Sequence, residues 1–257
     1  MHQKKVIITR PVAQAVDFAN KVRQLGCEAV VFPLIDIRAL DDRTELVAVA
    51  GQLEMFSLVV FVSPNAIDAF LPHVKSWPSS VPIGVMGSGS RRALCRFGID
   101  DQNTRILSPA NLAKTDSETL LEVLDVQALV GKQVLIVRGT GGRELLSDAL
   151  RSAGVHVQML TSYQRLAPAL TEDKKDALMQ LLDEDNRWVM TSSEALRTLM
   201  QWVEQLQSGE FVAKMQHQEM IVPHARIAET ATSLGFHFIT LTASGDESLL
   251  VALQSHV

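Results

Sequence analysis

Hydrophobic positions along the chain form short apolar runs separated by segments with helical spacing. Four runs are rich in β-branched residues and predict buried strands, at 6–9, 29–32, 58–62 and 134–137. Between the runs, apolar residues recur at i, i+3, i+4 and i+7, as at 146, 149, 150 and 153, which marks one face of a helix. Strands that alternate with helices predict an α/β fold with parallel sheets covered by helices on both faces.

The pattern of the first half recurs in the second half. Matched positions are Arg10 and Arg138, Gly26 and Gly154, Ser63 and Ser192, Glu118 and Glu247, and Gly98 and Gly235. The first four pairs are offset by 128 or 129 positions (138 − 10 = 128; 192 − 63 = 129) and the last by 137, which indicates an insertion after Val203. Ordered pairs at nearly constant spacing predict two copies of one α/β unit, and therefore two lobes.

A glycine-rich corner follows the strand at 134–137. Gly139, Gly141 and Gly142 let the backbone turn sharply before a helix begins, with Arg138 and Arg143 beside the turn. Exposed amides and the positive end of a helix point the same way at such a corner, which suits an anion. The alternative is that the glycines only make a tight turn.

Ligands of open parallel sheets bind outside the carboxyl ends of the strands. These ends are predicted at Arg10, Ser63, 87–90, 138–143, 192–193 and 224–226. If the two lobes face each other, these loops line one cleft.

Composition narrows the function classes. The chain has 24 Lys and Arg against 29 Asp and Glu, so its net charge of −5 does not favour nucleic-acid binding. Its apolar runs are shorter than a membrane span, and its N-terminus enters a strand without a signal-peptide core. Two cysteines that look unpaired suit a reducing compartment, so we expect a cytoplasmic protein. The seven histidines and two cysteines show no metal-ligand spacing.

An ordered set of short motifs then carries a family resemblance. The set is Ile-Ile-Thr-Arg-Pro at 7–11, Phe-Pro-Leu-Ile at 32–35, Val-Ser-Pro-Asn-Ala at 62–66, Val-Met-Gly at 85–87, Asp-Ser-Glu-Thr-Leu-Leu at 116–121, Val-Arg-Gly-Thr-Gly-Gly-Arg-Glu-Leu-Leu at 137–146, Tyr-Gln-Arg at 163–165 and Thr-Ser-Ser at 191–193. With these motifs the sequence resembles the uroporphyrinogen-III synthases, and the resemblance covers nearly the whole chain.

The resemblance implies two flavodoxin-like, HemD-like lobes with parallel sheets, joined by a two-stranded connector. Residues 1–35 would join 167–257 in one discontinuous lobe, and 38–162 would form the other. The connector strands would be 34–38 and 160–166. Because a two-stranded connector can act as a hinge, we expect the lobes to close over a ligand.

The resemblance also implies the reaction. The substrate of this family is hydroxymethylbilane, a linear tetrapyrrole that carries carboxylates on its rings. The enzyme removes water, inverts ring D through a spiro intermediate and closes the macrocycle to uroporphyrinogen III. No cofactor or metal is involved. We expect a monomer with neither a nucleic-acid nor a membrane partner, in transient contact with hydroxymethylbilane synthase.

The resemblance gives roles to the residues at the strand ends. Candidates for binding the substrate carboxylates are Arg10, Ser63, Ser88, Arg138, Gly139, Thr140, Ser192 and Arg226. Alternatively, the serines and glycines among them only cap the helices that follow. The pattern departs from the family at His224, where serine is common, and at Ile227, where threonine is common, which puts a contact there in doubt.

Tyr163 is the only tyrosine of the chain and matches a tyrosine that the family places at the connector. A phenol stays protonated at neutral pH, so it could donate a proton to the departing hydroxyl as a general acid. The alternative is that it packs at the hinge and only orients the substrate.

Two other function classes stay open at this point. A nucleotide-binding enzyme could use the glycines at 139–142 or 87–89, although neither segment fits Gly-x-Gly-x-x-Gly or is followed by a ribose-binding acid. A cytoplasmic two-lobed binding or sensor protein for an anion is the second alternative.

Overall fold

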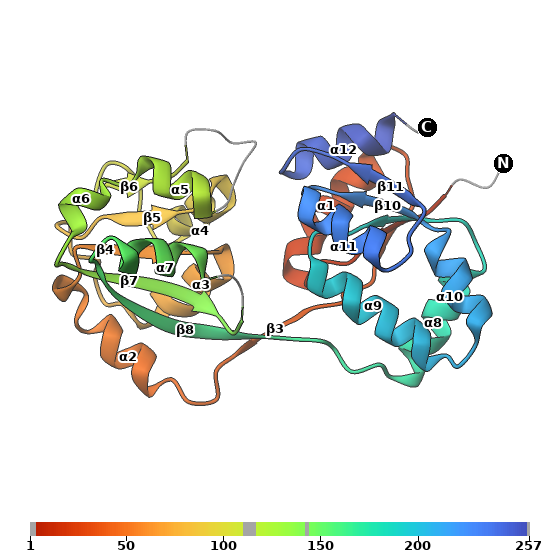
Figure 1. The fold of residues 1–257 in the computed structure, drawn as a ribbon, viewed down its shortest axis with the longest axis horizontal. Coiled ribbons are helices and arrows are strands. Elements are labelled where there is room, and N and C mark those ends of the chain that lie inside the picture. Colours follow the sequence, from red (N-terminus) through yellow and green to blue (C-terminus); the bar gives the residue numbers. More distant parts are fainter. Residues whose placement is uncertain (1–3, 110–116, 142–143, 256–257) are drawn as a thin grey trace. The chain divides into compact units, whose positions relative to one another are not determined.

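Two separate sheets organise the chain in the computed structural model, which describes residues 4–109, 117–141 and 144–255 (Figure 1). Lobe 1 is formed by 1–36 and 166–257, and lobe 2 by 37–165. Each lobe carries its own sheet and its own helices (Figure 1). The predicted α/β fold with parallel sheets is confirmed.

Lobe 1 is built on a five-stranded sheet in the order β11-β10-β9-β1-β2. Its strands are β1 (Val6–Ile8), β2 (Ala29–Val31), β9 (Arg187–Val189), β10 (Glu219–Val222) and β11 (Phe238–Leu241). The strand pairs from β1 to β2 and β9, and from β10 to β9 and β11, are parallel. Its helices are α1 (Val12–Gln24), α8 (Glu172–Leu182), α9 (Ser193–Gln205), α10 (Gly209–Gln216), α11 (Ala225–Ser233) and α12 (Asp246–Gln254).

Lobe 2 is built on a six-stranded sheet in the order β3-β8-β7-β4-β5-β6. Its strands are β3 (Asp36–Ala39), β4 (Leu58–Phe61), β5 (Ile83–Val85), β6 (Ile106–Leu107), β7 (Gln133–Gly139) and β8 (His156–Leu166). The strand pairs from β4 to β5 and β7, from β5 to β6, and from β7 to β8 are parallel. Its helices are α2 (Thr44–Ala50), α3 (Pro64–Phe70), α4 (Ser88–Arg96), α5 (Ser117–Val123), α6 (Val126–Leu129) and α7 (Leu145–Ser152), with short 3-10 turns at Leu53–Met55 and Leu71–His73.

The strand orders show how the two sequence copies are distributed. The first strand-helix-strand unit of the first copy (β1, α1, β2) lies in lobe 1 beside β9, β10 and β11 of the second copy. The matching unit of the second copy (β7, α7, β8) lies in lobe 2 beside β4, β5 and β6 of the first. The copies have therefore exchanged their first units, and both sheets have the same order, with β3 added at one edge of lobe 2.

The chain passes from one unit to the other after residue 36 and again after residue 165. A connector strand over 34–38 was predicted, but β3 begins only at Asp36. Leu34 instead remains with lobe 1, where its N–H donates to the carbonyl of Thr9 at 3.2 Å, and its side chain is fully buried. The N–H of Phe32 likewise donates to the carbonyl of Ile8 at 2.9 Å, so the chain is bound to the β1 side of lobe 1 up to this point and β3 starts later.

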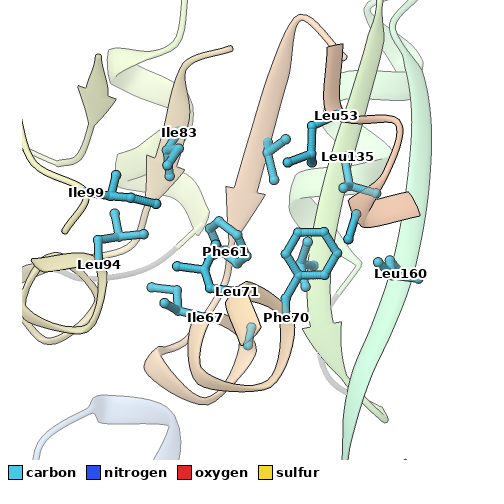
Figure 2. Close-up of a cluster of buried hydrophobic side chains, with 14 of the residues drawn as sticks. Leu53, Phe61, Ile67, Phe70, Leu71, Ile83, Leu94, Ile99, Leu135 and Leu160 are labelled. Carbon is cyan, nitrogen blue, oxygen red and sulfur yellow. The ribbon is translucent and has the colours of Figure 1, made fainter. Parts of the chain in front are cut away.

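Both faces of the lobe 2 sheet are buried. On β4, Val59 and Phe61 face one apolar cluster, and Leu58 and Val60 face another. Figure 2 shows the first cluster, where the rings of Phe61 and Phe70 lie 5.8 Å apart between their centroids. Burying each large side chain contributes about 1.5–3 kcal/mol. This packing explains why β4 reads as a continuous apolar run instead of an alternating one.

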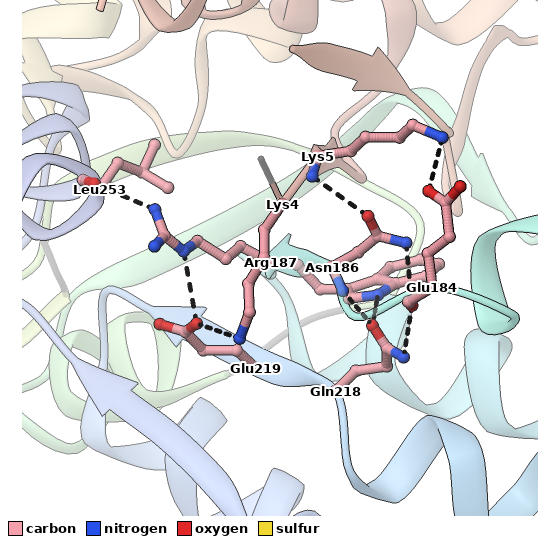
Figure 3. A network of polar contacts seen from close by, with 9 residues as sticks. Lys4, Lys5, Glu184, Asn186, Arg187, Gln218, Glu219 and Leu253 are labelled. Carbon is pink, nitrogen blue, oxygen red and sulfur yellow. Dashed lines mark hydrogen bonds and ion pairs between the residues drawn. The ribbon is translucent and has the colours of Figure 1, made fainter. Parts of the chain in front are cut away.

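A polar network joins the amino ends of the lobe 1 strands (Figure 3). Asn186 is buried, and its Oδ1 accepts from the backbone N–H of Lys5 at 3.2 Å. The N–H of Asn186 donates to Oε1 of Gln218 at 2.8 Å. A hydrogen bond from Nζ to the carboxylate of Glu184 raises the pKa of Lys5 above its ordinary value. These contacts hold the starts of β1, β9 and β10 together, so the polar side chains at this edge of the sheet stabilise the fold.

Some predicted features lie outside the described residues. They are residues 1–3 at the N-terminus, Asp116 at the start of the motif at 116–121, and Gly142 and Arg143 of the glycine-rich corner. Among the helices that are described, none combines the length and the apolar character needed to cross a bilayer.

Candidate functional site

The predicted site residues lie where parallel strands end and helices begin. In lobe 2 they are Ser63 after β4, Ser88 at the start of α4, Arg138, Gly139 and Thr140 at the end of β7, and Tyr163 on β8. In lobe 1 they are Arg10 after β1, Ser192 before α9 and Arg226 in α11. The structure thus places them in two groups, one at the carboxyl edge of each sheet.

Ser63 and Tyr163 form a hydroxyl pair in lobe 2. Ser63 is the N-cap of α3, and its Oγ accepts from the N–H of Ala66 at 3.2 Å. The same Oγ lies 3.1 Å from the phenol oxygen of Tyr163, which comes from a strand 100 positions later. Tyr163 is only 3% exposed, whereas Ser63 is half-buried. Ser63 is therefore the more accessible residue of the pair.

The ring of Tyr163 packs directly against Gly139. The β7–β8 register shifts between Arg138 and Gly139, and Gly139 pairs with Tyr163. A Cβ placed on Gly139 would lie 2.5 Å from Cζ of Tyr163, which is far inside van der Waals contact. Only glycine lets the ring approach β7 this closely.

Arg138 and Thr140 hold the same corner together. Arg138 is 8% exposed; its Nε donates to the carbonyl of Gly139 at 3.3 Å, and its Nη2 donates to the carbonyl of Gly141. Thr140 is exposed, yet its N–H donates to the carbonyl of Tyr163 at 3.0 Å and its Oγ1 accepts from the N–H of Arg165 at 2.9 Å. The guanidinium of Arg138 thus stabilises a turn, and the amide of Thr140 is engaged within the lobe.

The matching arginine of lobe 1 has a different partner. Nη1 of Arg10 lies 2.6 Å from Oδ1 of Asp246, the first residue of α12. The guanidinium carbon lies 4.6 Å from the centroid of the Phe18 ring. The side chain of Arg10 is 14% exposed, so this ion pair is partly shielded from solvent.

The remaining candidates differ in accessibility. Ser192 is the N-cap of α9, and its Oγ accepts from the N–H of Glu194 at 3.2 Å. Ser88 and Arg226 are exposed on α4 and α11. Their positions leave these two side chains accessible to an anionic ligand at the carboxyl edges.

The two departures from the family pattern lie together at the start of α11. His224 is its N-cap residue, and Nδ1 of His224 lies 3.4 Å from Oγ of Ser244. Ile227 is 1% exposed and packs in the core. A buried isoleucine cannot supply the hydroxyl that the family resemblance implies there.

Two partners at these corners were not anticipated from the sequence. One is Asp246, which pairs with Arg10, and the other is Ser162, whose Oγ donates to the carbonyl of Arg138 at 3.1 Å. The sequence could have indicated the position of Asp246, because acidic residues are favoured in the first turn of a helix. Groups of three or more His, Cys, Asp or Glu side chains suited to a metal do not occur among the described residues.

Comparison with known proteins decides the family. The family model described as HEM4, uroporphyrinogen-III synthase HemD, matches residues 16–247. The chain belongs to the uroporphyrinogen-III synthase family. The uroporphyrinogen-III synthase of Escherichia coli (strain K12) is 29% identical over 254 residues, covering 97% of this chain and 99% of that protein. That of Salmonella typhimurium (strain LT2) is also 29% identical over 254 residues, with the same coverage.

Solved uroporphyrinogen III synthases share the fold. A mutant enzyme of the extremely thermophilic bacterium Thermus thermophilus matches with a TM-score of 0.61 at 13% identity, covering 98% of this chain and 97% of that one. The enzyme of Helicobacter pylori 26695 also has a TM-score of 0.61, at 14% identity, covering 99% of this chain and 100% of that one. The resemblance inferred from the motifs is confirmed. Uroporphyrinogen-III synthases are enzymes of tetrapyrrole biosynthesis, so the nucleotide-binding and sensor alternatives are not favoured.

Proposed function

We propose that this chain cyclises hydroxymethylbilane to uroporphyrinogen III, with inversion of ring D through a spiro intermediate and loss of water. The observation that carries the proposal is the family match over residues 16–247. The enzyme works without a cofactor or metal in this proposal. We further propose that it acts in the cytoplasm as a monomer, supplied by transient contact with hydroxymethylbilane synthase, because its substrate closes spontaneously if left in solution.

The proposed site consists of groups at the carboxyl edges of the two sheets, some of which contact the substrate while others shape the loops. They are Arg10, Ser63, Ser88, Arg138, Gly139, Thr140, Ser192 and Arg226. Hydroxyls, amides and guanidinium groups bind carboxylates through hydrogen bonds that the negative charge strengthens. The net charge of the chain is −5, so binding an acidic substrate depends on such local groups and not on the overall field. In this proposal Ser88, Thr140 and Arg226 contact carboxylates directly, Ser63 contacts the substrate through its hydroxyl, and Arg10 and Arg138 shape the loops through their internal partners.

The catalytic task is chiefly one of geometry. Hydroxymethylbilane closes without an enzyme to the uninverted type I isomer, so the enzyme must favour attack at the position that leads to the spiro intermediate. When the enzyme holds the flexible tetrapyrrole in one folded conformation, the two reacting ends of the substrate meet often instead of rarely. Several separate anchors on two rigid sheets are suited to that task.

Tyr163 was assigned two alternative roles from the sequence, proton donation and orientation. Its low exposure of 3% and its hydrogen bond to Ser63 favour orientation. We therefore propose Tyr163 as a positioning residue of the reaction.

The test is an isomer analysis. Purified protein receives freshly prepared hydroxymethylbilane in the presence of a chelator and without nucleotide, and the products are separated by chromatography. The expected product is the type III isomer, whereas a reaction without protein gives type I. Recovery of type I alone from the complete reaction would overturn the proposed function.

A further inference from the structure

The hydroxyl pair of lobe 2 carries an inference about which group contacts the substrate. Oγ of Ser63 has two recorded hydrogen-bond partners, the N–H of Ala66 at 3.2 Å and the phenol oxygen of Tyr163 at 3.1 Å. Tyr163 belongs to the apolar core cluster of the lobe and is 3% exposed, whereas Ser63 is outside that cluster and half-buried. A substrate that approaches the carboxyl edge therefore reaches Ser63 before it reaches the phenol.

The direction of the hydrogen bond follows from burial and acidity. A buried O–H needs an acceptor, because leaving it without one forfeits its interaction with water. Within the part of the chain that is described, Oγ of Ser63 is the acceptor recorded for the phenol of Tyr163. A phenol is more acidic than an aliphatic hydroxyl, which makes it the better donor of the two. Tyr163 therefore donates to Ser63.

This direction leaves the proton of Ser63 available. Oγ of Ser63 accepts from both Ala66 and Tyr163, and these two bonds occupy its lone pairs. Hydrogen bonds in a chain polarise one another, so a hydroxyl that accepts two bonds becomes a stronger donor. Its own O–H must then point away from both partners.

The position of Tyr163 is fixed by its surroundings. The ring rests against Gly139, where a Cβ would lie 2.5 Å from Cζ, and the carbonyl of Tyr163 accepts from the N–H of Thr140 at 3.0 Å. A ring held in this way presents its hydroxyl at one place. The phenol can therefore set the orientation of the Ser63 hydroxyl.

We propose that, of the two hydroxyls in this pair, that of Ser63 contacts the substrate, and that Tyr163 is a positioning residue that acts through it. The proposal rests on the proposed function. Ser63 donates to an oxygen acceptor of the tetrapyrrole, either a side-chain carboxylate or the departing hydroxyl. If a Ser63 variant has a higher KM and an unchanged kcat, Ser63 binds a side-chain carboxylate. If it has a lower kcat and an unchanged KM, Ser63 donates to the departing hydroxyl.

A double-mutant cycle tests this order of action. Ser63→Ala removes the contact and should lower kcat/KM about tenfold to a hundredfold. Tyr163→Phe removes only the orienting hydroxyl and should lower it less. Because Tyr163 acts through Ser63, the double variant should match Ser63→Ala alone. A larger loss in Tyr163→Phe than in Ser63→Ala, or losses that multiply in the double variant, would overturn the proposal.

Two further variants separate the contact from helix capping. Ser63→Thr keeps both the capping oxygen and the donor, so it should retain most of the activity. Ser208 caps α10 through its Oγ, which accepts from the N–H of Glu210 at 3.3 Å, and Ser208→Ala is the matched control for a lost cap. It should leave kcat/KM unchanged. A Ser63→Thr protein that folds but is as impaired as Ser63→Ala would contradict the proposal.

Raman spectroscopy tests the hydrogen-bond direction without substrate. Tyr163 is the only tyrosine, so the tyrosine Fermi doublet reports this residue alone. The intensity ratio of the doublet should show a donating phenol in the wild type and in Ser63→Thr, and should change in Ser63→Ala. A ratio typical of an accepting phenol in the wild type would overturn the proposal even if the type III isomer forms. Formation of type I alone would overturn the function and leave the Raman result intact.

Discussion

Ser63 in lobe 2 and Ser192 in lobe 1 occupy equivalent corners of the two sequence copies, and different side chains surround them. Both serines cap a helix that follows a parallel strand. Ser63 also meets the phenol of Tyr163, at 3.1 Å. The position equivalent to Tyr163 in the first copy is Ile35 (163 − 128 = 35), which is 4% exposed. Duplication therefore supplied two similar corners, and only the one in lobe 2 has the phenol.

The two equivalent arginines differ in the same way. Arg138 donates to the carbonyls of Gly139 and Gly141, which are close to it in the sequence. Arg10 instead pairs with Asp246, which is 236 positions away in the sequence. One arginine shapes its own turn, and the other fixes the start of α12. Equal positions in a repeat thus do not imply equal roles, and variants at matched positions can measure the difference.

The largest effect is expected at Gly139. Gly139→Ala places a methyl group 2.5 Å from Cζ of Tyr163, and the resulting overpacking should cost about 3 kcal/mol of unfolding free energy. The equivalent position in the first copy is Pro11 (139 − 128 = 11), so a Cβ is tolerated there. Denaturant unfolding measures the change, with Gly209→Ala as the control, because a Cβ there meets nothing within 4 Å. Equal stabilities of the two variants would show that the Tyr163 ring is not seated as described.

The arginines should give a smaller difference. Arg138→Ala leaves two backbone carbonyls without their donor and should cost about 2 kcal/mol. Arg10→Ala breaks a partly exposed ion pair and should cost about 1 kcal/mol or less. Thermal and denaturant unfolding of both variants compares them directly. A greater loss in Arg10→Ala would reverse the roles assigned to the two corners.

The smallest difference between matched positions is expected at the two serines. Ser192→Ala removes the hydroxyl cap of α9 and should cost about 1 kcal/mol of stability. Its kcat/KM should fall only a few-fold, and less than that of Ser63→Ala, because the Ser192 corner has no phenol to orient the hydroxyl. Steady-state kinetics on the two variants side by side provide the measurement. An equal or larger activity loss in Ser192→Ala would show that the corners act alike.

Much of the backbone could be predicted from the sequence. The apolar run at 58–62 and the serine that follows it predicted a buried strand and a helix start, and both are present. These features are local, so neighbouring residues are sufficient to specify them. The exchange of the first strand-helix-strand units is different, because a repeat alone does not say which copy each unit joins. The expectation of that arrangement came from the family resemblance.

The partners at the site could not be predicted in the same way. Arg10 was expected to bind substrate, but its nearest partner in the fold is Asp246, 236 positions away. Gly139 was expected to bind a carboxylate, and the close packing of the Tyr163 ring against it was not foreseen. Sequence gives the kind of group at each strand end, whereas the distance to a partner depends on how remote segments pack.

Hydrogen exchange with product bound tests the central claim that the carboxyl edges of the two sheets carry the binding groups. Amide exchange is measured by mass spectrometry on the wild type with and without uroporphyrinogen III. The account predicts slower exchange at 63–66 and 139–140 in lobe 2 and at 192–194 in lobe 1, with no change around Asn186 and Gln218 at the opposite edge. Protection at the Asn186 edge, or at neither edge, would contradict it.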